Sequence, residues 1–325
     1  MKSPEAFRSF YDTALVPSLL QLEVERKKLV RNFFLFMIIP AVAAAGGLLF
    51  VRQLEIQIYI IIVVVAGIVG TGLFYAFNYK KIKTLKMRFK GDVIAKMVKF
   101  IDESLFYSPN NRISQSEYHQ SKLFLSGVDR YSGDDLVSGT LEKTSISFSE
   151  VHSEYKTTTT DSKGRTRTQW HTIFRGIFFI GDFNKNFNGE TIVLPDTAEN
   201  IFGSLGAMFQ KMNISRDQLV KLEDPEFEKH FCVYGNDQVE ARYILSPKLM
   251  QRIVELKKKS GKKIHLSFVH SKVFIAISIG KNLFEPPFFG TMFNYKLIEE
   301  FFRYLYLSVG IVEELDLNMR IWTKA

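Results

Sequence analysis

Two long apolar segments without any charged residue dominate the pattern of hydrophobic and polar positions. The first runs from Phe33 to Val51 and the second from Ile58 to Phe77. At about 1.5 Å per residue, each helix would be about 28–30 Å long, which matches the hydrocarbon core of a bilayer. Only residues 52–57 connect the two segments. The pattern therefore predicts two transmembrane helices that form an antiparallel hairpin.

Two other interpretations of these segments are less favoured. A buried helix of a soluble domain normally keeps a polar stripe, and neither segment has one. A signal peptide is disfavoured because the first segment is too long for a signal-peptide core and a second apolar segment follows at once. Neither segment contains an ionisable residue that would mark an ion path. We therefore interpret the hairpin as an anchor whose partner is the lipid bilayer.

Basic residues are distributed unevenly around the hairpin. The connection between the segments contains one, Arg52, whereas the outer flanks contain four and six. The ten flanking residues are Arg26, Lys27, Lys28 and Arg31 before the hairpin, and Lys80, Lys81, Lys83, Lys86, Arg88 and Lys90 after it. Because basic flanks stay preferentially on the cytoplasmic side, we expect both termini in the cytoplasm.

The same ten residues account for the positive net charge. The formal charge is +9, from 43 basic and 34 acidic residues. Outside the two flanks, 33 basic residues stand against 34 acidic ones, so the rest of the chain is nearly neutral. Nucleic-acid binding depends on a basic surface that contacts phosphates. We therefore expect no nucleic-acid partner.

The regions on either side of the hairpin predict further helices. Residues 1–32 are expected to form N-terminal cytoplasmic helices, and residues 78–108 an amphipathic stalk helix. The stalk has apolar residues at steps of three and four, namely Ile82, Leu85, Phe89, Val93, Met97, Ile101 and Leu105. The polar stretch 108–111 contains a proline and interrupts this pattern. Residues 109–325 are therefore expected to form a domain that folds without the anchor.

The remaining 109–325 region alternates between strand and helix patterns. The expected strands are Leu136–Leu141, Ser145–Thr158, Thr168–Phe183, Thr191–Leu194, Ile264–Phe268, Val273–Ile279 and Leu315–Ile321. The expected helices include Ala198–Met212, Pro247–Lys259 and Tyr295–Leu307. Consecutive hairpins favour an α+β fold with a largely antiparallel sheet. Two lobes, divided near residues 197–218, are a further possibility.

Four blocks of sequence resemble a known family. They are GDFNKNFNGETIVLPD (Gly181–Asp196), LEDPEFEKHFCVYGNDQVEARYIL (Leu222–Leu245), FEPPFF (Phe284–Phe289) and NMRIW (Asn318–Trp322). In this order behind a two-helix anchor, they are similar to the bacterial membrane protein family of unknown function DUF 3137. The resemblance implies a bacterial inner-membrane location and gives no catalytic residue. It also suggests a LemA-type membrane protein as a possible partner.

The sequence contains little that indicates catalysis. It has no phosphate-binding loop, no serine-nucleophile elbow, no zinc-protease motif and no EF-hand loop. The single cysteine, Cys232, excludes an intrachain disulfide and a cysteine-based zinc site, and its apolar surroundings favour an inert thiol. We expect no catalytic residue and no cofactor.

His152 and His171 are the weak exception. A two-residue turn between the long strands would place both imidazoles on one sheet face, where two histidines and a carboxylate can hold a metal. Surface histidines on a solvated ribbon are the favoured interpretation, since nothing in the sequence fixes the register.

Two segments are candidates for interaction. The threonine-rich hairpin tip contains Lys163, Arg165 and Arg167, and the proline-containing loop contains Phe284, Phe288 and Phe289. For the loop, a role in the core of the domain is favoured over an exposed docking patch. The sequence thus favours a membrane-anchored binding or scaffolding module. A membrane-tethered metal-dependent hydrolase and a lipid-headgroup-sensing domain are the alternatives, and the oligomeric state is open.

Overall fold

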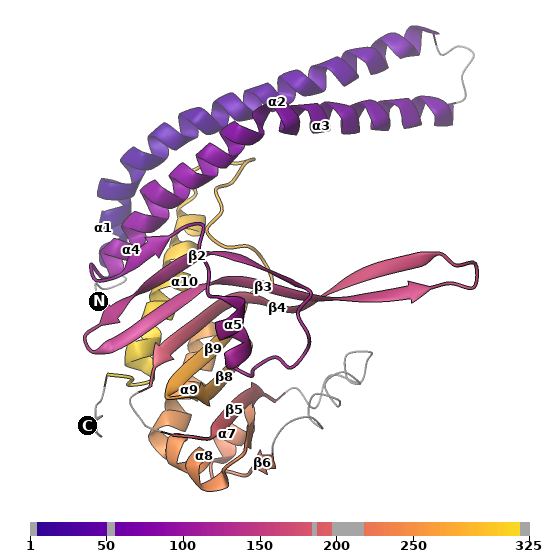
Figure 1. Cartoon of the computed structure of the whole chain (residues 1–325). Coiled ribbons are helices and arrows are strands. Elements are labelled where there is room, and N and C mark those ends of the chain that lie inside the picture. The colour runs from indigo at the N-terminus through magenta and orange to yellow at the C-terminus, as the bar shows by residue number, and fades with distance from the viewer. Residues whose placement is uncertain (1–4, 51–55, 184–186, 197–217, 319–325) are drawn as a thin grey trace. The chain divides into compact units, whose positions relative to one another are not determined.

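The computed structural model describes residues 5–50, 56–183, 187–196 and 218–318 (Figure 1). The chain divides into two compact units. One contains Met1–Met97 together with Phe284–Glu299, and the other contains Val98–Leu283 together with Glu300–Ala325.

The helical unit is built from two long antiparallel helices and their extensions (Figure 1). In chain order, the elements are α1 (Ala6–Phe10), the π-helical turn η1 (Tyr11–Leu15), α2 (Val16–Phe50), α3 (Ile56–Phe89), the π-helical turn η3 (Lys90–Ile94) and the start of α4 (Ala95–Ile101), whose residues from Val98 belong to the other unit. Gly70 of α3 leaves room for Pro40 and Met37 of α2, because a Cβ at Gly70 would lie 2.8 Å from the Met37 Cε. The two helices can therefore approach each other closely at this point.

Two helical stretches, Ala6–Gly47 and Ile56–Ile101, are long and apolar enough to cross a membrane. Their apolar side chains are mostly exposed: Val42 is 63% and Phe77 72% accessible. Other exposed apolar residues are Phe34, Leu35, Ile38, Ile60, Ile61, Val64, Val65, Ile68 and Val69. Since these side chains do not pack inside the described protein, the helices are unlike the core helices of a soluble domain.

The predicted stalk is shorter than its apolar stripe suggested. Six of the seven stripe residues are buried as expected, namely Leu85, Phe89, Val93, Met97, Ile101 and Leu105. However, the helix ends at Ile101, and Phe106–Ser108 form strand β1. Asp102 explains this end, because its Oδ1 accepts hydrogen bonds from the Ser104 amide at 2.9 Å and the Ser104 hydroxyl at 2.6 Å. Such a local turn competes with continuation of the helix.

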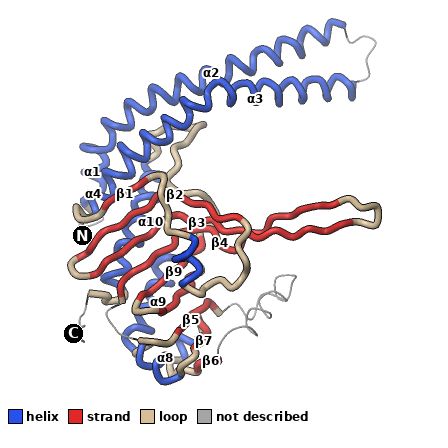
Figure 2. The backbone as a smooth tube through the Cα atoms, viewed as in Figure 1, coloured by secondary structure: helices blue, strands red, loops and turns tan. Residues whose placement is uncertain are grey.

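The second unit contains a nine-stranded sheet in the order β1-β2-β3-β4-β9-β8-β5-β7-β6 (Figure 2). The strands after β1 are β2 (Arg130–Leu141), β3 (Thr144–Thr160), β4 (Thr166–Asp182), β5 (Glu190–Pro195), β6 (Gln218–Val220), β7 (Phe231–Gly235), β8 (Ile264–Val269) and β9 (Lys272–Ser278). All described strand pairs are antiparallel. The predicted α+β fold with an antiparallel sheet and two long apolar helices is confirmed.

Helices cover the sheet and complete the core. They are α5 (Gln115–Gln120), α7 (Pro225–Glu228), α8 (Gln238–Ile244), α9 (Pro247–Ser260) and α10 (Tyr295–Glu314). Tyr118 of α5 lies over β4, with its ring 5.2 Å from that of Phe178. Phe178 is fully buried and belongs to a cluster with Phe174 and Phe274. The centre of β4 thus forms part of the core of this unit.

Local signals place the ends of α9 correctly. The Ser246 hydroxyl accepts a hydrogen bond from the Leu249 amide, Pro247 is the first helical residue, and Gly261 ends the helix at φ 61°. The N-cap, the proline at the first position and the left-handed C-terminal glycine explain why the helix agrees with the predicted Pro247–Lys259 to within one residue.

The strand predicted from Leu315 is wrong, and the helix predicted at Ala198–Met212 lies outside the described residues. Helix α10 continues to Glu314, and residues 315–318 form turns, so the strand predicted from Leu315 does not begin there. The amide of Leu317 instead bonds the carbonyl of Val312, which ends the helix. The predicted helix Ala198–Met212, and most of the predicted division into lobes, lie outside the described residues.

Candidate functional site

The β3–β4 hairpin extends beyond its neighbouring strands (Figures 1 and 2). Strand β2 pairs with β3 only as far as Glu154, and β9 pairs with β4 only from Gly176. Beyond these points, β3 and β4 pair only with each other, up to Thr160 and Thr166. We call residues 155–171 the ribbon. Every residue from Lys156 to Trp170 is exposed.

Polar and aromatic contacts hold the base of the ribbon. The Arg130 guanidinium lies over the Trp170 ring at 3.8 Å and pairs with Glu154 at 3.2 Å. The Asp129 carboxylate accepts a hydrogen bond from the Lys156 amide at 2.8 Å. A two-stranded hairpin alone is only marginally stable in water. These contacts therefore stabilise the ribbon at the end where it leaves the sheet.

The tip of the ribbon carries three basic residues found by sequence analysis. The Asp161 carboxylate accepts hydrogen bonds from the amides of Lys163 and Arg165, both at 2.9 Å, and Gly164 adopts φ 75°. These contacts form the turn of the hairpin, which is longer than the two-residue turn considered from the sequence because residues 161–165 separate the paired Thr160 and Thr166. The side chains of Lys163, Arg165 and Arg167 are exposed. Among the described residues, no carboxylate forms an ion pair with these three cations. The tip is a local concentration of positive charge.

The structure does not bring His152 and His171 together. His152 pairs with Arg175 and lies 3.2 Å from the Thr172 hydroxyl, whereas His171 pairs with Tyr155 and stacks on its ring. A bulge shifts the register between Ser153 and Glu154. His171 faces the same side as its partner Tyr155, which lies three residues from His152 along β3, so the two imidazoles lie on opposite faces. The expectation that they share a face is therefore wrong.

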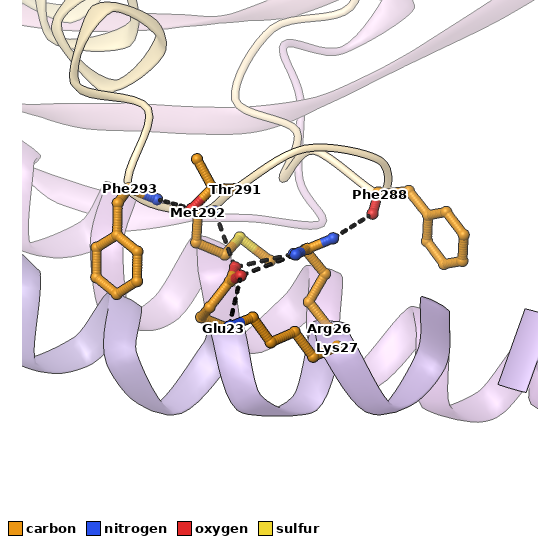
Figure 3. A network of polar contacts seen from close by, with 7 residues as sticks. All are labelled: Glu23, Arg26, Lys27, Phe288, Thr291, Met292 and Phe293. Carbon is orange, nitrogen blue, oxygen red and sulfur yellow. Dashed lines mark hydrogen bonds and ion pairs between the residues drawn. The ribbon is translucent and has the colours of Figure 1, made fainter. Parts of the chain in front are cut away.

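A second candidate site lies within the helical unit, where residues 284–294 contact α2 and α3. Figure 3 shows Glu23 and Arg26 of α2 facing this segment, which we call the clasp loop. The Glu23 Oε2 accepts hydrogen bonds from the Arg26 Nε at 2.9 Å and from the Met292 amide at 3.0 Å. The Arg26 Nη1 donates to the Phe288 carbonyl at 2.9 Å. One ion pair thus binds the loop backbone at two points.

The Glu23–Arg26 pair is buried. Its side chains are only 8% and 9% exposed, and a further contact joins the Arg26 Nη2 and the Glu23 Oε1 at 2.8 Å. The hydrogen bond from Arg26 is the main cause that lowers the pKa of Glu23, and the bond from the Met292 amide adds to it. The hydrogen bond with Glu23 in turn raises the pKa of Arg26. Both groups are therefore held in their charged forms.

Further contacts of the clasp loop are ionic and aromatic. Glu285 pairs with Lys86 at 2.6 Å and with Lys90 at 3.5 Å. The Phe288 ring lies 5.9 Å from that of Phe74, and the Phe289 ring lies 5.3 Å from that of Phe33. The two phenylalanines of the loop therefore pack on the long helices, and the sequence did not predict this partner.

The three phenylalanines of this segment have different environments. Phe284 is buried. Phe288 is half-buried. Phe289 is 60% exposed. Of the three, Phe289 therefore has the most exposed side chain.

A carboxylate cluster was not found from the sequence. Asp134, Asp135 and Glu150 have oxygen atoms within 4.8 Å of one another. The Glu150 Oε2 accepts a hydrogen bond from the Leu283 amide at 2.8 Å, and the Tyr107 hydroxyl bonds to Asp135. Adjacent strand residues normally face opposite sides, but β2 is irregular between Asp134 and Val137. No pattern in the sequence indicates this irregularity.

Comparison with known proteins adds a family match. Residues 172–317 match the model of a family described as "Protein of unknown function (DUF3137)". The resemblance noted from the sequence is confirmed over this range, which is slightly less than half of the chain and includes Gly181–Asp196, Leu222–Leu245 and Phe284–Phe289. No curated protein sequence matches the chain significantly.

Among solved structures, the chain is similar to "crystal structure of the mycobacterial trehalose monomycolate transport factor A, TtfA". The sequence identity is 9% and the TM-score is 0.30, over 68% of this chain and 96% of the other. This likeness is too weak to carry an argument about function.

Proposed function

We propose that the protein is a membrane-anchored binding module of the bacterial inner membrane. In this proposal the segments 33–51 and 58–77 cross the bilayer, both termini lie in the cytoplasm, and the ribbon binds a partner protein with an acidic surface. The exposed apolar helices support the anchor, and the ten basic flanking residues support the orientation.

The observation that carries the binding role is the exposure of the ribbon from Lys156 to Trp170. Ordering a residue costs about 1–2 kcal/mol of backbone entropy, and core burial does not offset this cost in the ribbon. Its base contacts keep it ordered, although the ribbon contributes little to the core. An ordered, exposed and basic projection fits a surface that binds another molecule.

Charge favours an acidic partner. From Lys156 to Trp170 the ribbon has four basic residues and one acidic residue, whereas the chain outside the hairpin flanks is nearly neutral. Complementary charge speeds association and selects partners. The resemblance to the DUF 3137 family suggests a LemA-type membrane protein as the first partner to test.

Charge reversal at the ribbon tip should weaken this binding while leaving the fold intact. We expect Lys163→Glu, Arg165→Glu and Arg167→Glu together to weaken the affinity for a LemA-type protein of the same organism by at least about tenfold. The affinity of the unmodified protein should also fall with added salt. The measurement is a binding titration between the two full-length proteins in separate detergent-solubilised preparations.

A matched control is available in the same unit. Lys221, Lys229 and Lys263 are also exposed, and replacing all three with glutamate changes the net charge by the same amount. This control should bind normally. Equal losses in the two triple variants would contradict a specific role of the ribbon. A loss of binding to anionic vesicles, with protein binding retained, would instead favour the lipid-headgroup-sensing function.

A further inference from the structure

We infer that the clasp loop is a third contact with the membrane, in which the side chain of Phe289 enters the boundary between lipid headgroups and acyl chains. This inference rests on the proposed function, namely that α2 and α3 cross the bilayer. The partner is the lipid surface itself.

The first argument is the position of the clasp loop along the two predicted spans. Phe289 contacts Phe33, the first residue of one uncharged segment, at a ring separation of 5.3 Å. Phe288 contacts Phe74, which lies three residues before the end of the other uncharged segment. Three residues correspond to about 4.5 Å of helix. The tip of the loop therefore lies beside the first turn of one span and the last turn of the other, at the level of the membrane boundary.

The second argument is exposure. Phe74 is fully buried beneath the loop, whereas Phe289 is 60% exposed. An exposed phenylalanine beside helices that also expose apolar side chains continues the same apolar surface. Aromatic residues are favoured at the interface between lipid headgroups and acyl chains. Lipid is therefore the medium that would cover Phe289.

The third argument is that the loop is held in position before it meets lipid. Pro286 and Pro287 fix their backbone φ angles, and the Phe288 carbonyl and the Met292 amide are bound by the Glu23–Arg26 pair (Figure 3). A loop that is already ordered loses less entropy when it inserts.

The charge of the clasp loop is also compatible with a position at the membrane surface. Glu285 is the only acidic residue from Phe284 to Asn294, and it pairs with Lys86 and Lys90. This pairing offsets the repulsion that an isolated carboxylate would experience from anionic headgroups. The apolar tip can therefore approach an anionic leaflet.

The test uses a single tryptophan as a depth probe in the full-length protein. Trp170 and Trp322 are replaced by phenylalanine, and Phe289→Trp is introduced. The protein is reconstituted into phosphatidylcholine and phosphatidylglycerol vesicles, with and without bromine on the acyl chains near the headgroup. We expect a blue-shifted emission and a loss of intensity with the brominated lipid.

Two control positions lie in the same unit. Phe77→Trp, at an exposed site within the second span, should be quenched. Leu20→Trp, at an exposed site of α2 that is 13 residues before Phe33, or about 20 Å along the helix, should not be quenched. Quenching at Phe77 but a water-like signal at Phe289 would overturn the inference and leave the anchor intact. Absence of quenching at Phe77 would overturn the anchor and the inference together.

A nitroxide probe provides a second readout if tryptophan disturbs the loop. Phe289→Cys in a Cys232→Ser background is labelled and its collision rates with oxygen and with a water-soluble nickel chelate are compared. Preferential collision with oxygen supports insertion, and preferential collision with the chelate contradicts it.

Discussion

Replacing Glu23 with glutamine should release the clasp loop from α2. Removing one partner of a buried ion pair leaves the other charge buried without compensation, which typically costs about 3–5 kcal/mol. Here the charge left behind is Arg26, whose side chain is only 9% exposed. We expect the free energy of opening of residues 286–294 to fall by roughly this amount. Hydrogen exchange of the Met292 amide in the full-length protein measures it directly.

Two comparisons make this result specific. Asp12→Asn breaks the Arg8–Asp12 pair, whose side chains are 62% and 52% exposed, and should leave stability nearly unchanged because solvent screens this pair. Glu23→Gln combined with Arg26→Met removes both charges and should recover much of the loss. If Glu23→Gln exchanges no faster than the unmodified protein, the ion pair does not hold the loop.

The same contact has a defined pH dependence. The pKa of Glu23 lies below its ordinary value of 4.5 in the folded protein. Its contribution is therefore fully present above the unfolded pKa and is lost as the pH falls through the lowered, folded value. Protection of the Met292 amide should decline at acidic pH in the unmodified protein. The Glu23→Gln variant should lack this component of the decline.

Truncation of Phe178 should destabilise the sheet unit by about 3–5 kcal/mol. This side chain is fully buried in β4, with ring neighbours Tyr118 at 5.2 Å, Phe174 at 6.2 Å and Phe274 at 6.4 Å. Phe178→Ala removes these contacts and leaves a cavity that the surrounding β-sheet can fill only in part. Urea-dependent pulse proteolysis of the full-length protein gives the change in the free energy of unfolding.

The control for Phe178→Ala is Thr159→Ala in the ribbon, on β3, which pairs with β4. Thr159 is exposed, so its replacement should change stability by less than about 0.5 kcal/mol. The two variants together separate the core from the ribbon. A large loss of stability in Thr159→Ala would show that the ribbon is a structural part of the unit.

Local features of the fold were predictable because their causes lie within a few residues. The apolar segments from Phe33 and from Ile58, the cap at Ser246 and the turn at Asp161 each depend on near neighbours in the sequence. Of the candidate site, the exposed cations at Lys163, Arg165 and Arg167 were predictable for the same reason.

Features that depend on distant contacts could not be predicted. The register at the hairpin tip, where Thr160 pairs with Thr166, decides which face His171 occupies, and no local signal revealed it. The Arg26–Phe288 contact joins residues 262 positions apart. The Glu23–Arg26 spacing of three is compatible with an ion pair on a helix, but a sequence alone does not tell a buried pair from an exposed one. The site within the helical unit therefore became visible only in the structure.

Cysteine accessibility in intact and permeabilised spheroplasts tests the membrane-anchored arrangement most directly. Gln53→Cys, Ser9→Cys and Arg165→Cys are introduced singly into a Cys232→Ser background and treated with a membrane-impermeant maleimide. We predict that the cysteine at position 53 reacts in intact spheroplasts, whereas those at positions 9 and 165 react only after permeabilisation. Reaction at position 165 in intact spheroplasts, or no reaction at position 53, would contradict a hairpin anchor that keeps the ribbon in the cytoplasm.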